Sequence, residues 1–142
     1  MNSKIDDLGL GVEYQPFRVL LDHPKTGLPL VDEASGEQAY IDVEGYDSDA
    51  GEKLRKAAFA RAQRQAKGFR ESSQTLEAAR EENADSLAQL TKGWMLVNLD
   101  GQKIDFECNA ANARAIYARP ATAWMAAQVQ AALRVEANFI KA

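Results

Sequence analysis

Residues that carry chemistry are scarce in this sequence. Its 142 residues include one cysteine, Cys108, and one histidine, His23. A lone cysteine cannot form a disulfide within the chain, and no group of cysteines and histidines has the spacing of a zinc site. His23 stands beside Pro24 in a turn-forming stretch, without the partners of a Ser–His–Asp or Cys–His arrangement. We therefore expect no catalytic, cofactor-binding or metal-binding residues, and predict that the protein is not an enzyme.

Long apolar runs are missing as well. No stretch approaches the roughly 20 apolar residues that cross a bilayer. The first 15 residues hold Lys4, Asp6 and Asp7 and lack the apolar core of a secretory signal. Gly9-Leu10-Gly11 is not followed by the Lys and Ser or Thr of a phosphate-binding loop. These absences predict a cytoplasmic protein without a membrane partner.

Charge is unevenly distributed along the chain. The net charge is −4, but residues 1–52 carry 12 acidic and 3 basic residues, whereas residues 53–70 carry seven basic residues and no acidic one. The basic residues spread around the predicted helix instead of forming one stripe. We favour a solvated or acid-paired helix face, then contact with a protein partner, and last contact with nucleic acid.

The N-terminal half predicts a hairpin followed by a helix. Residues 17–21 have strand composition, residues 22–27 have turn chemistry, and residues 38–44 alternate between apolar and polar. Asp47 or Ser48 is expected to cap a helix that runs to about Lys67, with a thin apolar stripe. Residues 1–15 lack these patterns, and we expect them to form a flexible arm.

The C-terminal half predicts a helix, a second hairpin and two further helices. The first helix spans about 74–90, and strands at 94–99 and 102–106 flank an Asp100-Gly101 turn. Asn109 is expected to cap a helix at 110–118, and a last helix is expected from 121 to about 140. The aromatic residues of this half are interpreted as core, or alternatively as an exposed groove for an amphipathic segment.

Together these elements predict a helix-dominated α+β fold. It has an N-terminal β-hairpin, a helical middle, and a C-terminal β-hairpin followed by two helices. Residues 16–142 are expected to form a single domain after the arm at 1–15, with 16–70 and 71–142 as two sub-parts.

Several short patterns follow one another in order over most of residues 17–140. The N-terminal half has Pro-Lys-Thr-Gly at 24–27, after Asp22, and Gly-Tyr-Asp-Ser at 45–48, ahead of the basic helix. The C-terminal half has Gly93-Trp94, Asp100-Gly101 and the run 106–117, and then Pro120, Trp124, Gln128-Val129 and Asn138-Phe139. These patterns resemble the tail assembly chaperones of long-tailed phages and prophages. Two departures are His23, inserted between Asp22 and Pro24, and Cys108-Asn109 in place of the family's acidic residue.

The resemblance implies a binding protein without catalytic activity. Such a chaperone would coat the tape measure protein in the host bacterial cytoplasm and recruit the tail tube protein during tail assembly. Self-association is a further expected contact. Two alternatives stay open: a structural minor tail or connector protein of the virion, and a small nucleic-acid-binding regulator that uses the basic helix 53–70. Exposed parts of the basic helix and of the last helix are the expected partner contacts, namely Arg55, Phe59, Arg61, Phe69, Trp124, Gln128 and Phe139.

Overall fold

A four-stranded antiparallel sheet organises the fold. The computed structural model describes residues 8–68 and 76–141, and at 61–62, 64–68 and 77 it describes the backbone alone. The strands are β1 (Phe17–Leu20), β2 (Tyr40–Val43), β3 (Thr91–Val97) and β4 (Lys103–Ile104). They lie in the order β1-β2-β3-β4, and each neighbouring pair is antiparallel. The α+β class predicted from the sequence is confirmed.

The central pairing of this sheet joins the two halves of the chain. Strand β2 pairs with β3, so that Ile41 lies opposite Trp94 and Asp42 opposite Gly93. β3 follows helix α3 (Leu76–Leu90) without a loop, because Thr91 already pairs with Val43. The strand predicted at 94–99 therefore begins earlier, at Thr91, because pairing with β2 satisfies the backbone of residues 91–93.

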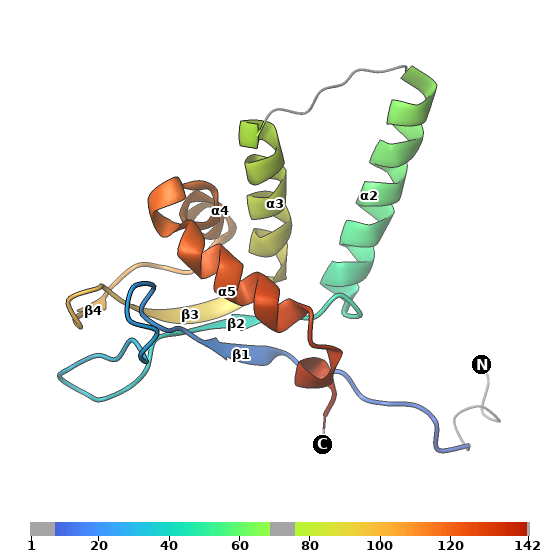
Figure 1. Cartoon of the computed structure of the whole chain (residues 1–142). Coiled ribbons are helices and arrows are strands. Elements are labelled where there is room, and N and C mark those ends of the chain that lie inside the picture. Colours follow the sequence, from blue (N-terminus) through green and yellow to red (C-terminus); the bar gives the residue numbers. More distant parts are fainter. Residues whose placement is uncertain (1–7, 69–75, 142) are drawn as a thin grey trace.

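Three helices cover one face of the sheet, and a fourth stands apart. Helices α3, α4 (Ala110–Ala118) and α5 (Ala123–Leu133) lie over the sheet, whereas α2 (Asp49–Gly68) rises beside them (Figure 1). Short 3₁₀ turns, η1 (Pro120–Thr122) and η2 (Glu136–Phe139), flank α5. Among the described residues, none of the helices is long and apolar enough to span a bilayer, and no cluster of residues has the composition of a metal site.

One core contains side chains from both halves. Alternation along β1 and β2 directs Val19, Ile41 and Val43 inward, where they are buried. The helices contribute further fully or nearly fully buried side chains, among them Leu87, Leu90, Tyr117 and Val129. On the opposite face of the sheet, Arg18 lies 3.6 Å above the Tyr40 ring and donates to Asp42 over 2.8 Å.

Caps and turns lie where the sequence predicts them. Ser48 caps α2, because its hydroxyl oxygen accepts a hydrogen bond from the Gly51 amide over 3.1 Å. Asn109 caps α4 by accepting from the Asn112 amide over 2.8 Å. Gly101 has a φ of 89°, which suits a tight turn that L-residues adopt with strain.

The last helix is shorter than predicted. It ends at Leu133 and not near Ile140, and the chain turns into η2. The Asn138 side-chain amide donates to the carbonyl of Ala132 over 3.1 Å, which holds this turn against the helix end. The break redirects Phe139 into the core, where its ring meets Phe17 edge-on at 5.8 Å.

Helix α3 is buried along only half of its length. Leu87 and Leu90 lie in the core, whereas Leu76 and Ala79 are exposed. The buried half is the end that lies nearest the sheet, where α4 packs beside it (Figure 1).

Candidate partner-binding surfaces

Helix α2 projects from the fold with little contact to the rest of the chain (Figure 1). Gly51 is buried at its base and Leu54 is half-buried, but every residue from Arg55 to Ala60 is exposed. Ala58, predicted to face a neighbour, is exposed too. Phe59 leaves 65% of its surface in solvent. An alanine-rich stripe buries too little area to hold the helix against its own fold, which leaves the helix surface free for another chain.

The base of α2 is held by Arg55. Its guanidinium donates to the carbonyl of Tyr46 over 2.7 Å and forms an ion pair with Glu52 at 3.1 Å. Asp47 lies 3.7 Å away on the other side. Part of the basic charge of this helix is therefore balanced locally, as the sequence interpretation favoured, and Arg55 has a structural role at the helix start.

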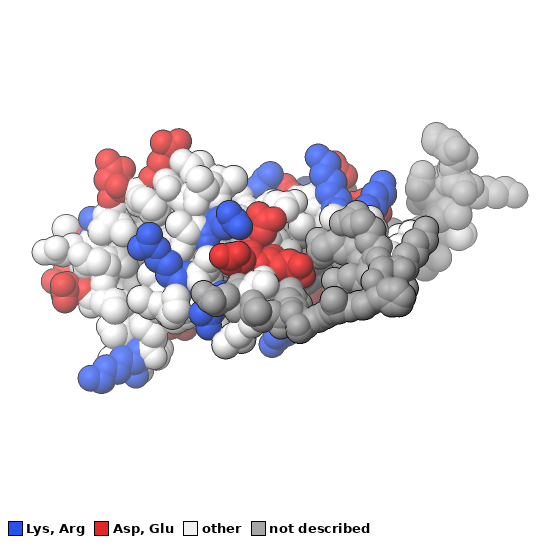
Figure 2. All heavy atoms as spheres, turned by 90° about the horizontal axis from the view of Figure 1, so that it is seen from above, with Lys and Arg blue, Asp and Glu red and all other residues white. Residues whose placement is uncertain are grey.

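Charges of both signs are mixed on the face seen from above (Figure 2). Acidic and basic side chains lie next to one another over its described part, including a mixed group near the centre. Lys53 and Lys56 are exposed on α2 near acidic Glu52. Over the described part of this face, Figure 2 shows acidic side chains between the basic ones.

An apolar groove of about 400 Å³ opens between the β3–β4 hairpin and the junction of α4 with α5. The hairpin side of this groove is formed by Leu96, Leu99, Ile104 and Phe106, and the helix side by Ile116, Trp124 and Met125. Leu99, Ile104 and Phe106 are exposed. Polar groups on its walls are few, so it suits apolar side chains better than a polar substrate.

The hairpin wall of the groove is fixed in place by Trp94. Its ring stacks on Phe106 with centroids 6.0 Å apart, and its Nε1 donates to the Phe106 carbonyl over 2.7 Å. An exposed apolar side chain that is held in one orientation loses little conformational entropy on binding. The part of the groove wall that Phe106 forms is therefore held in one orientation.

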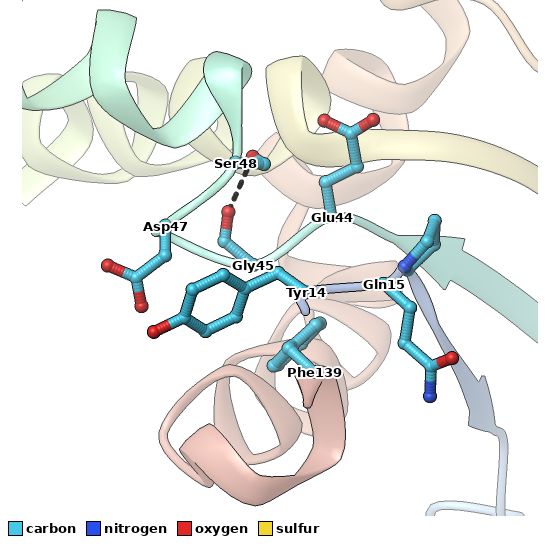
Figure 3. A pocket seen from close by; sticks show the side chains of 8 residues that line it. Tyr14, Gln15, Glu44, Gly45, Asp47, Ser48 and Phe139 are labelled. Carbon is cyan, nitrogen blue, oxygen red and sulfur yellow. Dashed lines mark hydrogen bonds between the residues drawn. The ribbon is translucent and has the colours of Figure 1, made fainter. Parts of the chain in front are cut away.

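A second hollow, of about 140 Å³, lies where the arm meets the C-terminal segment (Figure 3). The rings of Tyr14 and Phe139 border it, and the Ser48 hydroxyl donates to the carbonyl of Gly45 over 2.6 Å. Partial burial and the carboxylates of Asp47 and Glu136 raise the pKa of Tyr14. A Cβ at Gly45 would come within 2.8 Å of the Phe139 ring, so the Gly45 backbone packs tightly against this ring.

Five of the seven residues predicted to contact partners lie on α2, on the groove wall or outside the described residues. Arg55 and Phe59 are exposed on α2, and Arg61 lies on the same helix, where only its backbone is described. Trp124 is half-buried on the wall of the apolar groove. Phe69 lies outside the described residues. The projecting helix and the groove are separate surfaces.

The other two predicted contacts have internal roles. The Gln128 side chain donates to the carbonyl of Asp22 and accepts from its amide, both over 2.9 Å, and so ties α5 to the chain beyond β1. Phe139 is only 4% exposed. The prediction that Phe139 lies on a contact surface is wrong, because the early end of α5 turns the residue inward.

An inference about function has to start from the surfaces described above. No family model, curated protein or solved structure matches this chain. Within the sequence patterns described above, Ser48 and Asn109 cap helices and Gly101 forms a turn. Those residues stabilise local structure, whereas helix α2 and the apolar groove expose surface that could contact another molecule.

The sequence interpretation allowed an exposed groove among the aromatic residues of the C-terminal half, which include Phe106, but it did not identify Leu99 and Ile104. Both flank a tight turn, and their apolar character so close to it was the available signal of an exposed wall. A second apolar feature was missed in the arm. Leu8, Leu10 and Val12 alternate with Gly9 and Gly11 in the arm, a period of two in a segment interpreted as patternless. All three are exposed.

Proposed function

We propose that this chain is a tail assembly chaperone of a long-tailed phage or prophage, without enzymatic activity. It acts in the host bacterial cytoplasm, where it binds the tape measure protein and recruits tail tube subunits. The observation that carries the proposal is helix α2, which leaves its middle turns free of the fold. The ordered patterns at 22–27, 45–48, 93–94 and 106–117 support the same proposal.

A projecting helix suits a long helical partner. The 20 residues of α2 span roughly 30 Å, long enough for several turns of a second helix to lie along it. Ala57, Ala58 and Ala60 lie on other faces of the same turns, where their exposed side chains add little bulk. Phe59 supplies a single large apolar anchor, of the kind that dominates binding energy at interfaces. The remaining contacts are small, so the chaperone can be displaced when the tube polymerises.

The positive charge of α2 indicates what kind of partner surface would complement it. Lys56 lies one turn before Phe59 and is exposed beside it. A partner helix with an apolar residue flanked by Asp or Glu would pair with both side chains. Such ion pairs would increase the rate of association more than the affinity, because exposed ion pairs contribute little net free energy.

Co-expression with the tape measure protein tests the proposal. We expect the wild-type chain to keep the tape measure soluble and to co-elute with it in many copies, measured by pull-down and size-exclusion chromatography with light scattering. Phe59→Asp should lower the number of bound copies, while the melting temperature stays unchanged because the side chain is exposed. Leu28→Asp, at another exposed apolar position, is the matched control and should bind as the wild type does.

Three results would contradict the proposal. An insoluble tape measure alongside a chain that elutes alone would remove the chaperone role. Recovery of the chain in purified virions would instead indicate a minor tail or connector protein. DNA binding that weakens steeply with salt would indicate the nucleic-acid-binding regulator that uses residues 53–70.

A further inference from the structure

The first turns of α2 carry its described contacts with the core. Ala50 and Leu54 are partly buried and pack against the core, whereas residues 55–60 are exposed. Ala50 and Leu54 are four residues apart and therefore lie on one stripe of the helix. A helix that is held along a single stripe can rock about it, so a fixed direction requires contacts on a second stripe.

Gly51 and Arg55 provide the second stripe. They are also four residues apart, and each follows directly after a residue of the first stripe. Gly51 is buried, and a Cβ at this position would overlap the carbonyl group of Tyr46. The Arg55 guanidinium donates to the same carbonyl oxygen over 2.7 Å. The Tyr46 carbonyl is therefore held between two positions of the helix that follows it.

The contact with Tyr46 accounts for a glycine that is unfavourable for the helix itself. Glycine is a poorer helix former than alanine, and residues 52–60 are mostly good helix formers. Gly51 does not have a positive φ, so its backbone conformation alone does not require glycine. The atoms that a Cβ would meet belong to the backbone of Tyr46 and cannot rotate away as a side chain would. The close approach of Tyr46 is therefore the reason for glycine at this position.

The turn that contains Tyr46 is itself fixed to the body. The Glu44 amide donates to the carbonyl of Leu90, the last residue of α3, over 2.8 Å. The hydroxyl and the amide of Ser48 both donate to the Gly45 carbonyl, over 2.6 Å and 3.2 Å (Figure 3). Tyr46 lies between these bonded residues, so its carbonyl has a defined place relative to the sheet and α3.

We propose that the contact of Gly51 and Arg55 with the Tyr46 carbonyl fixes the direction in which α2 leaves the fold. The helix rises roughly 13 Å from Gly51 to Ala60, so a tilt of about 20° at the base would move Ala60 by roughly 5 Å. The place of Phe59 relative to the body is therefore set at the base of the helix. Under the proposed function, binding of the tape measure protein depends on that place.

Double electron–electron resonance between two spin labels measures the direction of α2. The labels are attached to cysteines, so Cys108→Ser first removes the natural one. Ala60→Cys places one label on α2 and Ala111→Cys places the other on α4, and both positions are exposed. Because α4 lies over the sheet, the distance between the labels reports how α2 stands on the body (Figure 1). This parent chain should give one narrow distribution of distances.

Two variants disturb the base of the helix. Gly51→Ala adds a Cβ that displaces the Tyr46 carbonyl, and Arg55→Met removes the hydrogen-bond donor while it keeps a side chain of similar shape. Each should shift or widen the distribution by at least about 3 Å, given the rise of the helix from its base to the label. Lys56→Met removes the same charge from an exposed neighbouring position and is the matched control, which should leave the distribution unchanged. Circular dichroism checks that every variant is folded.

An unchanged distance in a folded Gly51→Ala chain would overturn the proposal. If Gly51→Ala does not fold, an unchanged distance in Arg55→Met would overturn it instead. A broad distribution in the parent chain would overturn it as well, because the direction would then not be fixed.

Tape measure binding is a second readout, and this part of the inference rests on the proposed function. Gly51→Ala should lower the number of bound copies although Phe59 is unchanged. Full binding by a Gly51→Ala chain whose label distance has shifted would refute the link between direction and binding. If the wild-type chain binds no tape measure, the proposed function fails, whereas the label distances still decide whether the base fixes the helix.

Discussion

Replacing Phe139 separates a packing role from a partner-binding role. Its ring is 4% exposed, meets Phe17 edge-on and lies against Gly45. Truncating a buried phenylalanine to alanine costs about 3–5 kcal/mol through lost transfer free energy and the cavity that remains. Because Phe139 lies in the short 3₁₀ turn η2, whose backbone can relax, we expect Phe139→Ala to cost about 3 kcal/mol. In a domain of this size that corresponds to a fall in melting temperature of roughly 6–12 °C.

Urea unfolding followed by circular dichroism measures the loss, with Phe59→Ala as the matched control. The same chemical change at an exposed position on α2 should alter the free energy of unfolding by about 0.5 kcal/mol or less. Near-wild-type stability of Phe139→Ala combined with lost tape measure binding would refute the assignment of Phe139 to the core. It would instead restore the contact role that the sequence predicted.

Three further substitutions test local structure. Burial raises the pKa of Tyr117 to about 12, despite an opposing hydrogen bond from Thr91. The folded state therefore holds the phenol proton more tightly than the unfolded state, so stability is complete below pH 10 and falls by about 2–3 kcal/mol as pH rises to 12. Tyr117→Phe should remove that fall in urea titrations at each pH. Asn109→Ala should cost about 1 kcal/mol in the same assay by uncapping α4. Gly101→Ala should cost at least about 1 kcal/mol, because its φ is positive and its new Cβ would lie 2.9 Å from Glu33.

Local features of the fold could be predicted from the sequence. Capping by Ser48 and Asn109 and the turn at Gly101 each depend on a few adjacent residues, whose hydrogen bonds are the same in any surroundings. The α+β class follows from the alternation of β1 and β2 and the composition of the helices. These interactions are short-range, which is why sequence patterns report them well.

Features that depend on distant residues could not be predicted. To predict that β2 pairs with β3, one must know which strand edges meet, and no local sequence pattern determines this. The early end of α5 depends on Asn138 folding back onto Ala132, although residues 134–138 have acceptable helix propensity. The inward position of Phe139 follows from that end, so the prediction of a helix from 121 to about 140 placed Phe139 on the wrong surface.

The candidate surfaces were predicted in part. Exposure of Phe59 follows from the sparse alanine stripe around it, which the sequence shows. Exposure of the groove residues does not, because it depends on how the β3–β4 hairpin meets the α4–α5 junction. Trp124 was identified as a contact on the last helix, and the aromatic residues of that half were interpreted as core or, alternatively, as an exposed groove.

The pairing of β2 with β3 also affects how the chain folds during translation. Tyr40 and its partner Met95 are separated by about 50 residues, which include both α2 and α3. At roughly 5–20 residues per second, a ribosome needs several seconds to deliver the third strand after the first two. During that interval the β1–β2 hairpin has an unpaired edge and no core, and a two-stranded hairpin is marginally stable by itself. The nascent chain is therefore most prone to aggregation while the helical insertion is being synthesised.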